Sequence, residues 1–224
     1  MNLNLSELHR RLLPDLLSAG AAYPLALTGD YAALAHGLFD RPGRTLEAAT
    51  QHPAPMRTIA ETVAAVLRER GWSVSVRETD PLSAQLIVTD AVSEEAGEVD
   101  LLKEALWHPP VRTELGLTLS LEDTVGMRVW ALTDRGLPRD LLVVHAAADR
   151  WSLPDLEDLG RRHARDTFDL TDLQSRLTGT DWMDDREFTA YGLDDQAITA
   201  LRQWAQTWSD DIAERLIEAQ PPEE

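Results

Sequence analysis

The spacing of apolar residues changes part-way along the chain, and this change constrains the fold more than any other feature of the sequence. Up to residue 118, short apolar or alternating runs typical of strands lie between stretches with helical spacing. From residue 119 onward only the helical spacing recurs. The sequence therefore predicts an α+β fold with a helical C-terminal portion, and a boundary between residues 1–118 and 119–224.

Individual elements can be placed from the same spacing. The helix expected at residues 3–19 contains Pro14, which should interrupt or kink it. The helix expected after residue 120 begins with Ser120-Leu-Glu-Asp123, a helix-capping sequence. The predicted strands are 23–28, 45–50, 72–77, 84–89 and 98–103, and the predicted helices are 3–19, 31–36, 55–70, 121–136, 138–149, 154–165, 169–177, 185–191 and 194–218.

A formal net charge of −18 limits the partners that this chain can have. Nonspecific DNA binding depends on neutralising phosphates with Lys and Arg, so we expect none. A local basic cleft stays compatible with this composition, because field focusing depends on where the charges sit. The chain has no cysteine, which excludes disulfides and thiolate metal sites. No apolar run approaches the roughly 20 residues of a membrane helix, and the N-terminus does not resemble a signal peptide, so we expect a cytoplasmic protein without membrane association.

One constellation of residues has the layout of a phosphate-and-metal site. Gly29 makes a turn after a buried strand, a short helix follows, and the next strand carries Thr45 and Glu47 two residues apart. A glycine turn offers backbone N–H groups to phosphate. Alternate strand residues point to one face, so polar groups at these positions can share a magnesium ion with a further carboxylate from a neighbouring strand.

These segments resemble the motifs of the AbiEii/MenT-type nucleotidyltransferase toxins. The stretch from Leu25 to Glu47, LALTGDYAALAHGLFDRPGRTLE, is similar to a first motif that has a glycine turn, an Ala-His-Gly helix end, an arginine and Asp-x-Asp. Glu98-Val-Asp100 looks like the strand with the third carboxylate. Residues 119–140 resemble the later motifs, a lysine-bearing helix followed by Arg-Asp, and the resemblance spans residues 22–150.

The resemblance implies a nucleotidyltransferase-like mixed sheet flanked by helices, with residues 119–150 contributing to the active-site cleft. It implies that Glu47 and Asp100 bind Mg²⁺ with help from Thr45, and that Arg128 neutralises charge on an NTP substrate. By the same resemblance, the catalytic set is Thr45, Glu47, Asp100, Arg128 and Asp140, and the nucleotide-binding set is Thr28, Gly29, Asp30, Arg44 and Arg139.

Several positions depart from the family pattern. Asp30 stands where the family has Gly or Ser, which places a negative charge beside the expected triphosphate. Thr45 and Glu47 replace the two aspartates, and the extra methylene of Glu47 moves its carboxylate by ~1.5 Å. Arg128 replaces a lysine, and its planar fork is not equivalent to an ammonium. Val143 replaces a final aspartate and has no metal-binding group.

The resemblance implies a magnesium-dependent toxin that transfers a nucleoside monophosphate from an NTP to an acceptor. The 3′ end of a tRNA is the expected acceptor, and a cognate antitoxin protein is an expected partner. The altered positions keep a second interpretation open, in which the chain is a catalytically weak or inactive relative that binds a nucleotide or a protein partner.

The candidate residues also have structural interpretations. Asp100 could cap a turn at the end of a strand, and Glu47 could be an exposed strand residue. The arginines of residues 119–140 either line a phosphate site or pair with nearby carboxylates; the arginines are Arg128, Arg135 and Arg139, and the carboxylates are Glu122, Asp134 and Asp140.

Overall fold

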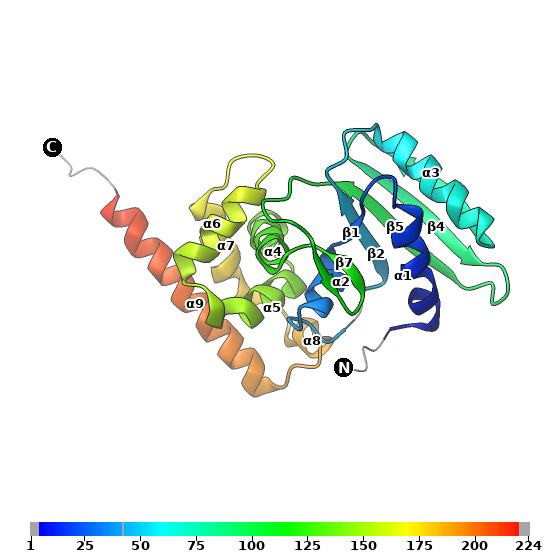
Figure 1. Cartoon of the computed structure of the whole chain (residues 1–224). Helices are drawn as coiled ribbons and strands as arrows, with labels where there is room; N and C mark the ends of the chain where they lie inside the picture. Colours follow the sequence, from blue (N-terminus) through cyan, green and yellow to red (C-terminus); the bar gives the residue numbers. More distant parts are fainter. Residues whose placement is uncertain (1–4, 42, 220–224) are drawn as a thin grey trace. The chain divides into compact units, whose positions relative to one another are not determined.

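A computed structural model describes residues 5–41 and 43–219 of the chain. The chain divides into two compact units, Met1–Thr124 and Val125–Glu224. Figure 1 shows the sheet and the helices α1–α3 in the first part of the sequence, and helices throughout the remainder. The α+β fold with a helical C-terminal portion is therefore confirmed.

The first unit is built on a seven-stranded mixed sheet with the strand order β3-β4-β5-β2-β1-β7-β6. At its centre β2 and β5 run parallel and pair through six residues, from Thr45 opposite Glu98 to Thr50 opposite Lys103. The remaining neighbours pair antiparallel, except β1 and β7, which are parallel. The strands are β1 (Ala26–Leu27), β2 (Thr45–Thr50), β3 (Trp72–Thr79), β4 (Ser83–Asp90), β5 (Ala96–Lys103), β6 (Val111–Thr113) and β7 (Gly116–Thr118).

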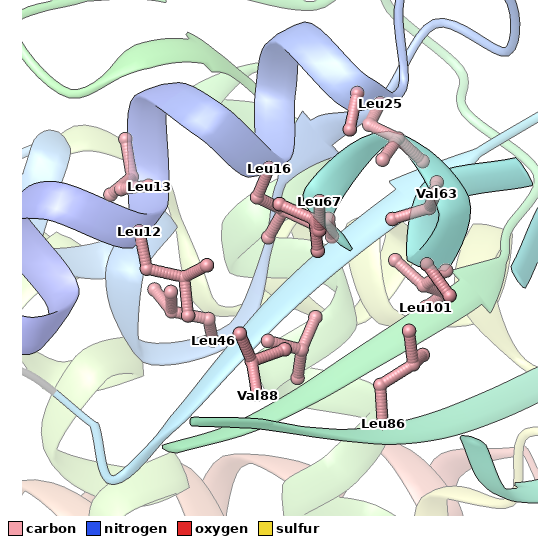
Figure 2. Close-up of a cluster of buried hydrophobic side chains, with 14 of the residues drawn as sticks. Leu12, Leu13, Leu16, Leu25, Leu46, Val63, Leu67, Leu86, Val88 and Leu101 are labelled. Carbon is pink, nitrogen blue, oxygen red and sulfur yellow. The ribbon is translucent and has the colours of Figure 1, made fainter. Parts of the chain in front are cut away.

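Two helices, α1 (Glu7–Ala19) and α3 (Met56–Glu69), pack on one face of this sheet. Figure 2 shows leucines of α1 and Val63 and Leu67 of α3 meeting strand residues such as Leu46 and Leu101. These strand side chains are fully buried. Because successive strand side chains alternate between faces, the residues between them, including Glu47 and Asp100, belong to the opposite face.

The expected interruption of the first helix at Pro14 is wrong, because α1 runs as one helix from Glu7 to Ala19. Proline removes one backbone hydrogen bond from a helix interior, which is a cost to stability. The leucines Leu8, Leu12 and Leu16 on the core-facing side of α1 are at most 4% exposed, and their burial favours the helix on both sides of the proline.

The sequence missed two strands of the sheet. β6 and β7 have three residues each and form a hairpin, with Thr118 of β7 opposite Leu27 of β1. Strands of this length carry too few residues for alternation to show. The strand expected at 23–28 is real but shorter, because only Ala26 and Leu27 pair.

The second unit is helical. Helix α4 (Leu121–Arg135) begins in the last residues of the first unit and continues into the second. Glu157 is buried in this unit and accepts hydrogen bonds from Trp208 Nε1 at 2.9 Å and Arg215 Nη1 at 2.9 Å. The other helices are α2 (Gly29–Ala35) of the first unit and α5 (Pro138–Ala147), η1 (Ala148–Arg150), α6 (Leu153–His163), α7 (Leu170–Gly179), η2 (Thr180–Trp182), α8 (Asp185–Thr189) and α9 (Asp195–Glu218) of the second.

None of the helices within residues 5–41 and 43–219 combines the length and the apolar character that crossing a membrane requires.

Candidate active site on the first unit's sheet

Four polar side chains form a square on the sheet face opposite the core. The parallel register places Thr45 opposite Glu98 and Glu47 opposite Asp100. The Thr45 hydroxyl donates a hydrogen bond to Glu98 Oε2 at 3.3 Å. The two predicted metal ligands, Glu47 and Asp100, are thus neighbours on adjacent strands, and Thr45 lies beside them.

Gly29 is shaped to accept the Glu47 side chain. Its φ is +61°, and a Cβ atom at this position would lie 1.5 Å from Glu47 Oε2. The backbone also connects the two segments, because Thr28 N–H donates to the Glu47 carbonyl at 3.0 Å. The missing side chain of Gly29 therefore leaves the space that the Glu47 carboxylate fills.

Asp100 is held in partly desolvated surroundings. Burial raises its pKa above the usual 3.8, and the nearby charge of Glu98 acts in the same direction. A hydrogen bond from the Gln85 side chain on β4 lowers the pKa and offsets part of this effect. Gln85 is the register partner of Asp100 on the side away from β2. A carboxylate in these surroundings gains from a cation that would neutralise it.

The loop before β2 is fixed by polar contacts with α2. Asp30 is 8% exposed, and its carboxylate packs so closely on Gly43 that a Cβ there would lie 2.9 Å from Oδ2. The Tyr31 hydroxyl is hydrogen-bonded to His9 Nδ1 and donates to the Gly43 carbonyl at 3.4 Å. Burial raises the Tyr31 pKa and the charge of Asp30 raises it further. Arg44 follows Gly43 and is exposed.

In the second unit, the predicted site residues Arg128 and Asp140 form an ion pair with each other. Asp140 is fully buried and accepts a hydrogen bond from Arg128 Nη1 at 2.7 Å. Arg135 contributes two more bonds to the same carboxylate, from Nε at 2.9 Å and Nη2 at 3.1 Å. Of the two interpretations given to these arginines, pairing with Asp140 is the one observed for Arg128 and Arg135. Arg139, on the next helix, is partly buried.

The structure therefore groups the predicted residues in two sets. Thr45, Glu47, Asp100 and the turn at Gly29 come together in the first unit, and Arg128 and Asp140 come together in the second. Two further residues of the first set were not predicted. Glu98 shares a strand face with Asp100 by simple alternation, so the sequence contained that signal. Gln85 depends on the antiparallel register of β4 and β5, which no local pattern reveals.

The residues of the first set fit a magnesium ion that a nucleotide substrate helps to bind. Among the described residues, no group of three or more His, Asp or Glu side chains is placed to hold a metal by itself. Magnesium in nucleotide sites is commonly bound by one or two carboxylates, and substrate phosphates and water supply the other oxygens. Glu47 and Asp100 provide two such carboxylates on facing positions.

Known proteins resemble this chain in fold but not detectably in sequence. No protein-family model and no curated protein matches the sequence. The crystal structure of JHP933 from Helicobacter pylori aligns with a TM-score of 0.58 at 16% identity, over 96% of this chain and 97% of that chain. A structure described as a "putative nucleotidyltransferase from H. pylori" aligns with a TM-score of 0.59 at 16% identity, over 97% and 100%.

The chain therefore has the fold of these two H. pylori structures, one of which is described as a "putative nucleotidyltransferase". The structure of the RNA terminal uridylyltransferase Cid1 aligns over 66% of this chain and 44% of that chain with a TM-score of 0.34, which is too low to indicate a shared fold. At such identities the likeness concerns the path of the chain rather than its chemistry. The nucleotidyltransferase-like part of the fold prediction is thereby confirmed.

The contact between Gly29 and Glu47 predicts a specific loss of stability. Gly29→Ala should cost about 1–2 kcal/mol for the left-handed backbone, plus a further amount for displacing Glu47. The control is Gly37→Ala, because Gly37 has φ +69° and open space at its Cβ position. Urea unfolding should show a larger loss for Gly29→Ala than for Gly37→Ala. In a Glu47→Ala background the two losses should become equal, and an unchanged gap there would contradict the steric explanation.

The raised pKa of Asp100 predicts how stability depends on pH. The folded state favours the protonated form of Asp100 more than the unfolded chain does, because its folded-state pKa is raised. The stability that Asp100 contributes in this way is fully present below the unfolded pKa and is lost as pH rises through the folded pKa. Asp100→Asn, which cannot ionise, should therefore be more stable than the wild type at pH 7. The gain should shrink as pH falls through the raised pKa of Asp100, measured by urea unfolding at several pH values. A difference that stays constant with pH would show that ionisation is not its cause.

Proposed function

We propose that this chain is a nucleotidyltransferase of the AbiEii/MenT toxin type, which transfers a nucleoside monophosphate from an NTP to an acceptor. The observation that carries the proposal is the facing pair Glu47 and Asp100 on parallel strands, beside the glycine turn at Gly29. The pair lies in a fold similar to that of the H. pylori nucleotidyltransferase candidate. The 3′ end of a tRNA is the acceptor that we propose, and a cognate antitoxin is the proposed protein partner.

Magnesium is the proposed cofactor, and Glu47 and Asp100 are the residues that would hold it. When bound, Mg²⁺ would polarise the phosphate under attack and neutralise charge that develops during transfer. The residues of this chain would hold the two metal-binding carboxylates in place. Gly29 leaves room for the Glu47 carboxylate, and Gln85 orients Asp100 through its hydrogen bond. Thr45 adds a neutral oxygen on the same face, beside Glu98.

The net charge of −18 is consistent with a substrate bound at a defined site rather than along an extended nucleic-acid surface. A tRNA acceptor would then be held mainly where its 3′ end meets the catalytic face. This arrangement needs only a short basic stretch, and exposed Arg44 next to Thr45 provides one cation for it.

The test is transfer of radiolabel from each α-labelled NTP to total tRNA in the presence of magnesium. Glu47→Gln and Asp100→Asn preserve side-chain size and should each lower the rate by at least about 100-fold, because a lost electrostatic contact to the reacting phosphate costs roughly 3 kcal/mol or more in the transition state. Thr45→Ala should have a smaller effect. Glu61→Gln, an exposed carboxylate on α3, is the matched control and should leave the rate unchanged. Equal transfer by all of these variants would remove the assignment of the site.

A second candidate function is favoured by the state of Arg128 and Asp140. In this interpretation the chain is a catalytically weak or inactive relative that binds a nucleotide or a protein partner. Asp140 is fully buried and bonded to two arginines, which is the arrangement of a structural ion cluster. Asp30, packed on Gly43 in the nucleotide-binding segment, adds a negative charge that disfavours a triphosphate.

The two candidates predict different behaviour for Arg128. Removing one partner of a buried ion pair commonly costs 3–5 kcal/mol, so Arg128→Met should unfold at a markedly lower urea concentration if the residue is structural. The double variant Arg128→Met/Asp140→Leu should recover much of that stability. If the double variant is well folded and transfers label at the wild-type rate, Arg128 and Asp140 are not catalytic. If it is well folded and inactive, the pair belongs to the active machinery.

Calorimetry with magnesium and each NTP separates the two functions directly. The transferase predicts magnesium-dependent binding that weakens in Asp100→Ala and leads to turnover with an acceptor. Binding without turnover across nucleotides and acceptors would support the inactive relative.

A further inference from the structure

A pocket of about 340 Å³ lies at the other end of β2 and β5 from the candidate active site. Thr50 ends β2 and Lys103 ends β5, and these two residues are the last register pair of the parallel strands. The pocket is lined by these residues and by the segments that follow them. In sheets with parallel strands, ligands commonly bind outside the carboxyl ends of the strands.

This pocket is separate from the face that carries Glu47 and Asp100. Strand side chains alternate, so Thr50 shares a face with Leu46, and Lys103 shares a face with Leu101, both of which are core residues. From Glu47 to Thr50 is three residues, which is about 10 Å along the strand. The pocket therefore opens beside the helix-covered face, and an occupant would not compete for the proposed magnesium site.

Backbone hydrogen bonds fix the pocket walls. Lys103 N–H donates to the Leu82 carbonyl at 2.8 Å, which holds the β3–β4 turn against the end of β5. Glu104 N–H donates to the Thr50 carbonyl at 3.2 Å, and Gln51 Nε2 donates to the Leu106 carbonyl at 3.1 Å. Two of these three bonds join main-chain groups and the third comes from a side chain, and together they hold the segments that line the pocket in place.

Two groups on the lining can donate to an anion. Lys103 is the only lysine in the chain, and toward the residues that the structure describes its ammonium donates one hydrogen bond, to the Pro53 carbonyl at 3.3 Å. An ammonium has three N–H donors, so two more are available to a ligand. His52 accepts from Ala54 N–H at its Nδ1, at 3.2 Å, which places the proton of a neutral imidazole on Nε2. His52 therefore presents a second donor.

The other lining residues narrow the ligand class. Leu82 is 52% exposed and forms, with Pro53, an apolar wall. Glu104 also lines the pocket, and its carboxylate disfavours a ligand with several negative charges. The volume is at the small end of the range for organic ligands. The charge of Glu104 therefore disfavours a triphosphate, whereas one carboxylate with a short apolar substituent matches the donors and the apolar wall.

We propose that this pocket binds a small monoanionic organic acid, whose carboxylate pairs with Lys103 and His52 and whose apolar part lies on Leu82. The site is independent of the transferase chemistry proposed above. Binding should therefore be present in Asp100→Asn as in the wild type, and it stands or falls without reference to nucleotide transfer.

The single lysine makes the test direct. Acetylation by an amine-reactive ester is followed by mass spectrometry on the purified full chain, with the chain's α-amine as internal reference. Acetate, butyrate and benzoate are the probes, and sodium chloride at equal ionic strength is the blank. A probe at ten times its Kd should slow acetylation of Lys103 about tenfold and leave the α-amine rate unchanged. Butyrate or benzoate should act at lower concentration than acetate, because only they reach the apolar wall.

Calorimetry with the best probe gives the second readout. Lys103→Gln should weaken binding at least about tenfold through loss of a charge-assisted hydrogen bond, and Glu104→Gln should strengthen it. Arg112→Gln removes the same charge from exposed β6 and should bind as the wild type does. Protection by none of the three acids would overturn the proposal, as would wild-type affinity in Lys103→Gln. Protection by inorganic phosphate but by no carboxylate would overturn the ligand class.

Discussion

The parallel pairing of β2 with β5 is the interaction on which the rest of the first unit depends. Its register decides that Glu47 faces Asp100 and that Thr45 faces Glu98. The same register sends Leu46 and Leu101 to the opposite face, where α1 and α3 bury them. A shift by one residue would move the carboxylates into the core and the leucines into water. Burial of the apolar face therefore fixes the geometry of the polar face.

Much of the fold could be predicted because its main elements repeat over several turns or pleats. The limits of β2 were predicted to the residue, and α3 and α9 to within one residue at each end. The pairing of Glu47 with Asp100 was accessible only through a resemblance to known motifs, since strand order is not a local property. Gln85 escaped for the same reason, because its place beside Asp100 depends on the register of β4 with β5. The strands β6 and β7 escaped because three residues are too few for alternation to show.

The buried cluster around Asp140 shows why sequence motifs do not assign roles by themselves. Arg128 and Asp140 match a motif by position, and yet in the structure their charges satisfy each other. A fully buried carboxylate requires such partners, because an unpaired charge in that place would be far more costly than the pair. An arginine in this cluster can stabilise the helices α4 and α5 whether or not it also meets a substrate.

The carboxylates on the sheet face with Glu47 and Asp100 differ from that of Asp140, whose negative charge is paired with two arginines. Asp100 has a raised pKa, Glu98 adds charge beside it, and Glu47 occupies space that only a glycine at position 29 leaves free. The raised pKa of Asp100 and the adjacent charge of Glu98 lower the stability of the chain at neutral pH compared with a neutral surface. Carboxylates placed this way on a strand face contribute nothing to the core, which is complete on the other side. A bound cation would neutralise these carboxylates and stabilise their arrangement, and this expected gain is the physical basis for proposing that the chemistry takes place on this face. The cluster around Asp140 lacks that basis, because Arg128 and Arg135 already pair with its charge.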